Sequence, residues 1–312
     1  MRPLTRETLR GTWAPVLLPL AEDDSIDIGR LAQELAALVE AAPDGIYSCG
    51  TAGEFHALDE QEYDRITALV AEGCTAAGVP FQLGASHMSG QISLHRIRRS
   101  AAFQPSAIQV ILPDWCELSA DEVLFAIERM AQAAEPVPLV LYNPPHAKTR
   151  LTPGLFGRLA AAFPQLAGIK VAGGDAAWFT EMRASAPGLA IFVTGNRLAS
   201  GLRHGASGSY SNVACLSPRG AVWWFQTMLA DPARALALET RLNAFLERRI
   251  LPLQRAGYSN AALDKTLAAV GGWAPIGTRT RWPYRFVPED VASALVPEAR
   301  HELPEFLGAG PA

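Results

Sequence analysis

The sequence predicts an α/β fold in which eight parallel strands alternate with helices and a purely helical region follows. From residue 11 to about residue 225, short apolar runs alternate with amphipathic runs of helix length, the pattern of repeated strand and helix units around a parallel sheet. After about residue 226 the strand pattern stops. With 312 residues, 49% of them hydrophobic, the chain is long enough for one large barrel or for two ordinary domains, so the pattern has to decide.

The predicted strands are apolar runs rich in β-branched and aromatic residues, and most are bounded by Gly, Pro, Asp or Asn. They cover residues 12–20, 44–50, 80–86, 107–113, 138–143, 166–173, 189–195 and 208–214. The first run follows three arginines and so copies a secretory signal superficially. Pro15 and Pro19 interrupt it and acidic residues follow, so we interpret it as a strand.

Helix starts follow these strands, with Asp27, Asp59, Ser89, Ser119 and Thr152 as the N-caps. Eight strands, each followed by a helix, are the composition of a (β/α)8 TIM barrel. We therefore expect a catalytic barrel over residues 1–225 and a helical region over 226–312 that packs on it, with helices at 233–250, 260–272 and 289–303. An open, doubly wound sheet is the alternative, but it favours a glycine-rich phosphate loop after its first strand, and residues 17–27 contain no glycine.

Composition narrows the class of partner. The net charge of -4, with the arginines scattered along the chain, favours a small-molecule partner and gives no reason to expect nucleic acid. The four cysteines have no C-x-x-C spacing, which argues against a zinc site and a disulfide framework and favours reduced thiols in a cytoplasm. No apolar run approaches the roughly 20 residues that cross a bilayer, so no membrane span is expected.

A lysine stands inside the apolar run GIKVAGGD, residues 168–175. The active site of a barrel lies at the carboxyl ends of its strands, and Lys170 ends the sixth. Burial there would lower its pKa, so that the neutral amine could attack a ketone and form a Schiff base. In the alternative, the lysine reaches solvent or pairs with a carboxylate such as Glu54. We interpret Gly173 and Gly174 as space for a substrate beside the amine.

Tyr142 closes the fifth strand, and the residues 143–145 that follow, Asn-Pro-Pro, force a rigid turn. A phenol fixed at a strand end can transfer protons, although a core tyrosine with a bonded hydroxyl is the alternative. Because consecutive strands are neighbours in a barrel, Tyr142 and Lys170 are expected to face the same opening.

The loop after the second strand reads CGTAGEFH, residues 49–56. Gly50 and Gly53 permit a tight turn whose successive N–H groups can bind a carboxylate, and Thr51 adds a hydroxyl. The alternative is that these glycines only make the connection to the next helix. Taken with Tyr142 and Lys170, Thr51 completes a candidate catalytic group across one opening.

Three motifs stand at strand ends in this order: GTAGE (50–54), YNPP (142–145) and GIK (168–170). In these the chain resembles the dihydrodipicolinate synthase and N-acetylneuraminate lyase family of Schiff-base lyases. The resemblance implies that Lys170 attacks C2 of a 2-oxo acid, that Tyr142 transfers protons and that Thr51 hydrogen-bonds the phenol. It also implies that the backbone amides of Thr51 and Ala52 hold the substrate carboxylate, that no metal or cofactor is needed, and that the chain forms a homotetramer, a dimer of dimers.

The chain departs from both family types where they bind the rest of the substrate. Asp114 and Trp115 replace a tyrosine pair of the synthase, Ala147 replaces its arginine, and Arg197 stands where the lyase has an acidic pair. We expect Trp115 to form an apolar wall and Ser209 to line the pocket, while Arg197 and Lys148 suit an anionic or hydroxyl-rich end of the substrate. Packing at an interface for Trp115 and ordinary solvation for Arg197 are the alternatives.

The sequence therefore predicts a Schiff-base lyase, an aldolase or a dehydratase, that acts on pyruvate or on a 2-oxo acid such as a 2-oxo-3-deoxy sugar acid. One alternative is a synthase that condenses pyruvate with an aldehyde. Another is a non-catalytic barrel that binds a sugar acid and uses Lys170 only as a charge partner, and a third is a metal-dependent aldolase.

Overall fold

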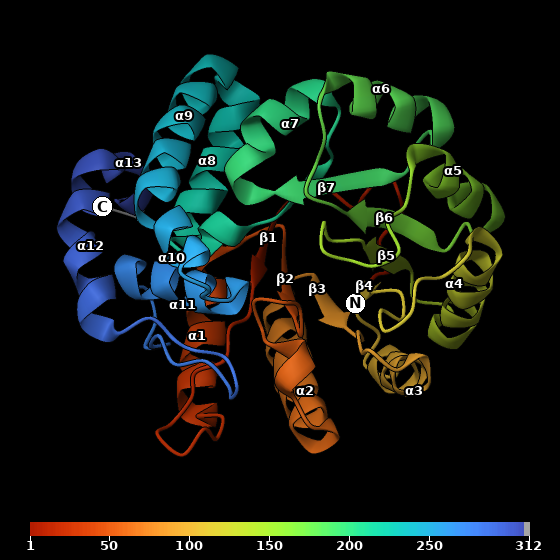
Figure 1. Cartoon of the computed structure of the whole chain (residues 1–312), viewed down its shortest axis with the longest axis horizontal. Helices are drawn as coiled ribbons and strands as arrows, with labels where there is room; N and C mark the ends of the chain where they lie inside the picture. The colour runs from red at the N-terminus through yellow and green to blue at the C-terminus, as the bar shows by residue number, and fades with distance from the viewer. Residues whose placement is uncertain (309–312) are drawn as a thin grey trace.

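The computed structural model describes residues 1–308 and contains a closed barrel of eight parallel strands in chain order (Figure 1). The strands are β1 (Gly11–Pro15), β2 (Gly45–Ser48), β3 (Phe81–Gly84), β4 (Ala107–Val110), β5 (Leu139–Tyr142), β6 (Leu166–Lys170), β7 (Ala190–Thr194) and β8 (Gly208–Tyr210). Pairing of β1 with β8 closes the barrel. The predicted TIM barrel is confirmed.

Eight helices cover the barrel, one after each strand. They are α1 (Ile28–Ala41), α2 (Glu60–Ala77), α3 (Gly90–Ala101), α4 (Ala120–Ala134), α5 (Pro153–Ala162), α6 (Ala176–Ser185), α7 (Leu198–His204) and α8 (Pro218–Ala230). Short 3₁₀ turns follow three of the strands: η1 (Phe55–Ala57), η2 (Gly195–Arg197) and η3 (Asn212–Ala214).

The helices after the barrel gather on one side of it, next to α8 and α1 (Figure 1). They are α9 (Pro232–Arg249), α10 (Leu251–Arg255), α11 (Asn260–Gly271), α12 (Glu289–Glu302) and α13 (Pro304–Leu307). The three expected helices correspond to α9, α11 and α12, and the two short ones were not expected. The division into a barrel and a helical region near residue 225 stays a proposal, and residue 225 lies inside α8.

The first strand is shorter than the predicted run 12–20. After β1 ends at Pro15, the Val16 amide still donates to the Tyr47 carbonyl at 2.8 Å, but the Leu17 amide donates instead to the Glu34 carboxylate at 2.6 Å. Proline has no N–H for a ladder, so Pro15 and Pro19 limit the pairing of this run. The apolar residues beyond Pro15 remain buried, which explains why they resemble a strand.

The barrel interior holds a core of its own, separate from the core between strands and helices. Its largest members are aromatic: Trp13, Tyr47, Phe192 and Tyr210. Tyr210 contacts the other three, with ring centroids 4.8–6.0 Å apart. Because side chains alternate along a strand, the residues between these inward positions face the helices. These aromatic rings fill part of the barrel interior.

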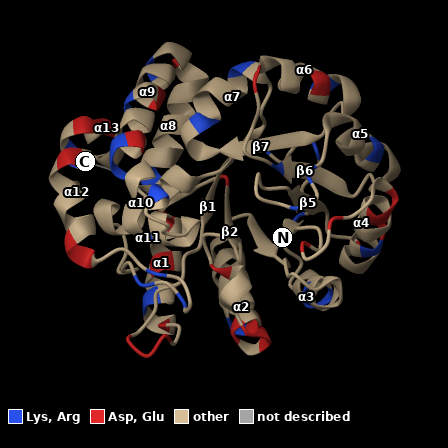
Figure 2. Ribbon diagram, in the orientation of Figure 1, with Lys and Arg blue, Asp and Glu red and all other residues tan. Residues whose placement is uncertain are grey.

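Charged residues of both signs are interspersed over the helices in the view of Figure 2. Within residues 1–308, no helix combines the length and the apolar character that a membrane span needs.

Candidate active site

A cavity of about 290 Å³ opens at the carboxyl-terminal ends of the strands. It brings together three of the predicted residues, because Lys170 ends β6, Tyr142 ends β5 and Thr51 follows β2. Tyr142 and Lys170 are direct partners in the β5–β6 register. The lining residues are Tyr47, Thr51, Ala52, Tyr142, Lys170, Thr194, Tyr210, Asn212, Leu246, Ile250, Gln254, Asn260, Leu263, Asp264 and Leu267.

The Lys170 amine lies among three phenol rings. Its Nζ is 4.4 Å from the ring centroid of Tyr142, 4.9 Å from that of Tyr47 and 5.2 Å from that of Tyr210. Desolvation in these surroundings lowers the pKa of Lys170 to about 8, and the nearby Asp264 carboxylate opposes the shift. The amine is therefore partly neutral near physiological pH, as a nucleophile requires.

Tyr142 is held at the cavity wall by the loop that follows it. The side-chain amide of Asn143 donates to the Thr149 carbonyl at 2.8 Å and accepts from the Leu151 amide at 3.0 Å, which fixes the turn after β5. Burial raises the pKa of the Tyr142 phenol, and a hydrogen bond with the Thr51 side chain opposes that rise. The phenol is thus a proton donor with a hydroxyl partner beside it.

The loop after β2 has backbone conformations and close contacts that few residue types tolerate. Cys49 and Glu54 both have φ of 51°, and a Cβ at Gly53 would lie 2.9 Å from the Val16 carbonyl oxygen, so a glycine is needed there. A Cβ at Gly50 would lie 2.9 Å from the Tyr47 ring. Neither the Thr51 nor the Ala52 amide donates a hydrogen bond to any protein group within residues 1–308. These two amides are free to bind an anion.

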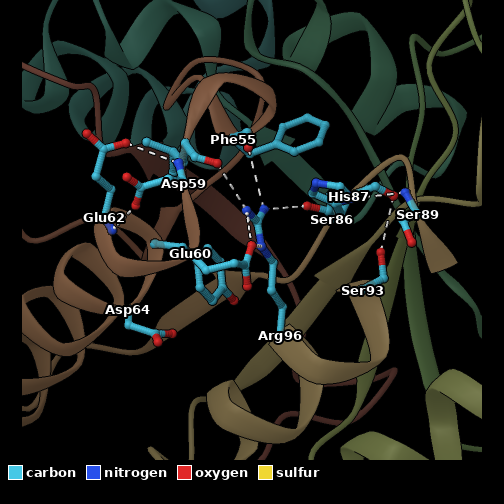
Figure 3. A network of polar contacts seen from close by, with 12 residues as sticks. Phe55, Asp59, Glu60, Glu62, Asp64, Ser86, His87, Ser89, Ser93 and Arg96 are labelled. Carbon is cyan, nitrogen blue, oxygen red and sulfur yellow. Dashed lines mark hydrogen bonds and ion pairs between the residues drawn. The ribbon is translucent and has the colours of Figure 1, made fainter. Parts of the chain in front are cut away.

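A buried arginine fixes the far end of this loop (Figure 3). Arg96, on α3, is fully buried and donates to the Ser86 carbonyl at 2.8 Å and to the Phe55 carbonyl at 3.5 Å. It also forms an ion pair with Glu60, at 2.8 Å, at the start of α2. Because carbonyls and a carboxylate surround the guanidinium, α3 anchors the connection between the Thr51 loop and α2.

Glu54 forms an ion pair with Lys265 and not with Lys170, which was the alternative considered from the sequence. Its Oε1 lies 2.5 Å from Nζ of Lys265 on α11, and neither side chain has any exposed surface. Its Oε2 accepts from the Arg281 amide at 2.8 Å. The alternative in which Lys170 pairs with Glu54 is therefore wrong. The Glu54 carboxylate instead ties the Thr51 loop to the helical region.

The sequence reasoning missed several residues that line the cavity. Tyr47 lies within β2, whereas Thr194 and Tyr210 end β7 and β8. The others, apart from Asn212 in η3, come from the helical region, which was treated only as packing. Asp264 is the most important of these, since its carboxylate faces Lys170. A charged pair, Asp264 and Lys265, inside the apolar run NAALDKTLAAV was the signal that could have revealed it.

A second cavity of about 300 Å³ adjoins the first and shares Thr51, Tyr142 and Asn260 with it. Asp114 and Ala147, two of the positions where the chain departs from the family pattern, line this second cavity. The two cavities together extend the space around the Lys170 amine well beyond a three-carbon acid.

Six predicted substrate-binding residues lie outside both cavities: the loop glycines Gly50 and Gly53, and Trp115, Lys148, Arg197 and Ser209. Trp115 is 78% exposed, and Lys148 donates to its carbonyl at 2.6 Å with Nζ 4.9 Å from its ring, so the two residues engage each other. Arg197 is exposed at the end of η2. Ser209 is buried beside the inward-facing Tyr210, and the alternation of side chains turns it away from the interior.

The glycine pair after β6 has a local explanation rather than the expected one. Gly173 has φ of 96°, a conformation that residues other than glycine rarely adopt. A Cβ at Gly174 would lie 2.5 Å from the Trp178 ring. Neither glycine lines the cavity. The pair therefore serves the turn from β6 into α6.

Over residues 1–308, His, Cys, Asp and Glu side chains form no group of three that could hold a metal ion.

Residues 8–295 match the model of the dihydrodipicolinate synthetase family. The chain belongs to this family. Membership confirms the expected class of enzyme, a lyase of the class I aldolase type.

Relatives in the family carry both synthase and lyase names. The chain is 28% identical over 281 residues to a 4-hydroxy-tetrahydrodipicolinate synthase of Methylococcus capsulatus, an alignment that covers 87% of this chain and 95% of that one. It is 31% identical over 163 residues to an uncharacterized DapA-like lyase of Thermococcus kodakarensis, where the alignment covers 52% of this chain and 54% of the relative.

Solved structures share the fold. YagE of E. coli K12, in complex with pyruvate, superposes with a TM-score of 0.83 at 21% identity and covers 94% of this chain and 98% of that one. N-acetylneuraminate lyase of Mycoplasma synoviae superposes with a TM-score of 0.80 at 21% identity, over 96% and 99% of the two chains.

Proposed function

We propose that the chain forms a Schiff base between Lys170 and the C2 carbonyl of a 2-oxo acid, and that it cleaves or dehydrates a 2-oxo-3-deoxy sugar acid. The observation that carries the proposal is the Lys170 amine, 4.4 Å from the Tyr142 ring in the cavity at the carboxyl-terminal ends of the strands, with its pKa lowered to about 8. Two free amides on the Thr51 loop supply a site for the carboxylate next to that carbonyl.

The chemistry follows from these positions. The neutral Lys170 amine attacks C2, and an amine proton moves to the carbonyl oxygen. The resulting hydroxyl takes a proton from the Tyr142 phenol and leaves as water, so that a protonated imine and a phenolate remain. In an aldol cleavage, the bond between C3 and C4 breaks, its electron pair moves into the protonated imine, and the C4 hydroxyl proton passes to the phenolate. The resulting enamine takes a proton at C3 from the phenol. Water then hydrolyses the protonated imine to pyruvate and the free amine, and the proton that is released returns to the phenolate.

The extended cavity supports a substrate longer than pyruvate. The second candidate function is the condensation of pyruvate with an aldehyde to a cyclic dicarboxylic product. Ala147, which stands where the synthase has an arginine, argues against it. Aldol cleavage and dehydration share the imine, and a screen of 2-oxo-3-deoxy sugar acids for released pyruvate or for loss of water distinguishes them.

Borohydride reduction in the presence of pyruvate tests the proposal directly. The chain contains only three lysines, Lys148, Lys170 and Lys265, so peptide mass analysis can assign the adduct without ambiguity. We expect the mass increase on Lys170 and its loss in Lys170→Ala, while Lys148→Arg, as the matched control, retains it. A protein that gives no adduct with several 2-oxo acids is a binding barrel rather than a lyase.

We also propose a homotetramer, a dimer of dimers, that works in the cytoplasm. Family resemblance supports the assembly, and the free cysteines, Cys49, Cys74, Cys116 and Cys215, support a reducing compartment. Sedimentation equilibrium of the purified chain tests the assembly, with a monomer as the contrary result.

A further inference from the structure

Part of the cavity wall is made by the helical region rather than by the barrel. Leu246 and Ile250 come from α9 and the residue after it, Gln254 from α10, and Asn260 and Asp264 from α11. Ser259 fixes the start of α11 by accepting a hydrogen bond from the Ala262 amide. Asp264 is therefore presented to the cavity from a capped helix and not from a loose loop.

The charges along the cavity are few. Among its lining residues, Lys170 is the single cation and Asp264 the single carboxylate, and no arginine is present. The other polar groups are neutral hydroxyls and amides, those of Thr194, Asn212 and Asn260 among them. A substrate arm that extends from Lys170 toward the helical region therefore meets uncharged polar groups and one anion.

The Asp264 carboxylate is placed for a role beyond fold stability. The buried ion pair that joins the helical region to the barrel uses the next residue, Lys265, whose ammonium lies on Glu54. Within residues 1–308, the protein groups that stabilise the charge on Asp264 are the Cys215 thiol and the Lys170 ammonium. Carboxylate oxygens offer about four acceptor positions, so most of those on Asp264 remain available to a ligand.

We propose that Asp264 selects the substrate: its carboxylate accepts hydrogen bonds from hydroxyl groups beyond the oxo carbon and repels a second carboxylate there. This inference rests on the proposed function and deepens it. The preferred substrate is then a hydroxylated 2-oxo acid with a single carboxylate and an uncharged far end. A hydroxy-2-oxo diacid is disfavoured because its far carboxylate would face Asp264 with no arginine to pair with it.

The test compares two substrates, 2-oxo-3-deoxygluconate and 4-hydroxy-2-oxoglutarate, by pyruvate release. We expect the unmodified protein to have the higher kcat/KM for the monoacid. In Asp264→Asn, the ratio of the two kcat/KM values should fall at least tenfold in favour of the diacid, mainly through opposite changes in KM. Glu247→Gln, which removes a negative charge from the exposed surface of α9, is the matched control and should keep the original ratio.

Equal changes for both substrates in Asp264→Asn, or a higher kcat/KM of the unmodified protein for the diacid, overturn the selection role. If neither compound is cleaved, their competition against pyruvate-dependent borohydride trapping gives the ranking, and stronger protection by the diacid overturns the proposal in the same way. A different result, no pyruvate adduct on Lys170 at all, refutes the Schiff-base function itself, so the two failures are distinguishable.

Discussion

The pH dependence of imine trapping on Lys170 is the sharpest consequence of its surroundings. Desolvation lowers the pKa of this amine from 10.5 to about 8. At pH 7 the neutral fraction is then about 9%, against about 0.03% for an unperturbed lysine, a gain of roughly 300-fold. Because only the neutral amine attacks a carbonyl, the initial trapping rate should rise about tenfold per pH unit below pH 7.5 and level off above pH 9.

The assay is the initial rate of pyruvate-dependent borohydride labelling, with the adduct quantified on the Lys170 peptide. Asp264, which lines the same cavity and has a pKa raised to about 7, also titrates between pH 7 and 9. Burial raises the pKa values of Tyr142 and Cys215 above the ordinary values of a phenol and a thiol. The Asp264 carboxylate raises the pKa of Lys170, so Asp264→Asn should move the plateau to lower pH.

A labelling rate that still climbs tenfold per unit beyond pH 9 would show that the amine is solvated like an ordinary lysine, and the argument from desolvation would then be wrong. A shift to higher pH in Asp264→Asn would contradict the assigned sign of the charge interaction.

The remaining predictions concern the proton path and the anchor of the loop. Tyr142→Phe should lower kcat by about 100-fold to 10,000-fold, because it removes the proton donor, while the pyruvate adduct still forms slowly; unchanged kcat in steady-state assays would exclude the role. Thr51→Val should lower kcat less, since it removes only the partner of the phenol, and Thr51→Ser should restore most of the loss. Lys265→Met should reduce the free energy of unfolding, measured in urea, by about 3–5 kcal/mol, because the Glu54 carboxylate is left buried without its partner. The double variant Lys265→Met with Glu54→Leu should recover much of this loss. Equal losses in the single and double variants would contradict the pairing.

Much of the fold could be predicted because parallel strands buried on both faces produce apolar runs at regular spacing. The first strand was overextended because the residues after Pro15 are as buried as a strand, although the Leu17 amide bonds to the Glu34 side chain. The pattern of apolar residues indicates which residues are buried. Only the backbone hydrogen bonds distinguish a strand from a buried extended segment.

The candidate site was predictable where barrel geometry dictates it. Lys170 and Tyr142 end adjacent strands, so the fold itself brings them together. Trp115 and Arg197 were misplaced because the direction of a loop side chain does not follow from strand order. Asp264 was missed although the reasoning applied to Lys170, a charge in an apolar run, applies to it equally.

The adjacent residues Asp264 and Lys265 separate two duties within one turn of α11. Lys265 holds the helix to the barrel through Glu54, while Asp264 faces the cavity, so substitutions at position 264 leave the anchor intact. The helical region thus offers a route by which substrate preference could diverge among related enzymes while the strands and the imine-forming lysine stay unchanged. A library limited to positions 246, 250, 254, 260 and 264 would explore that route without disturbing the barrel.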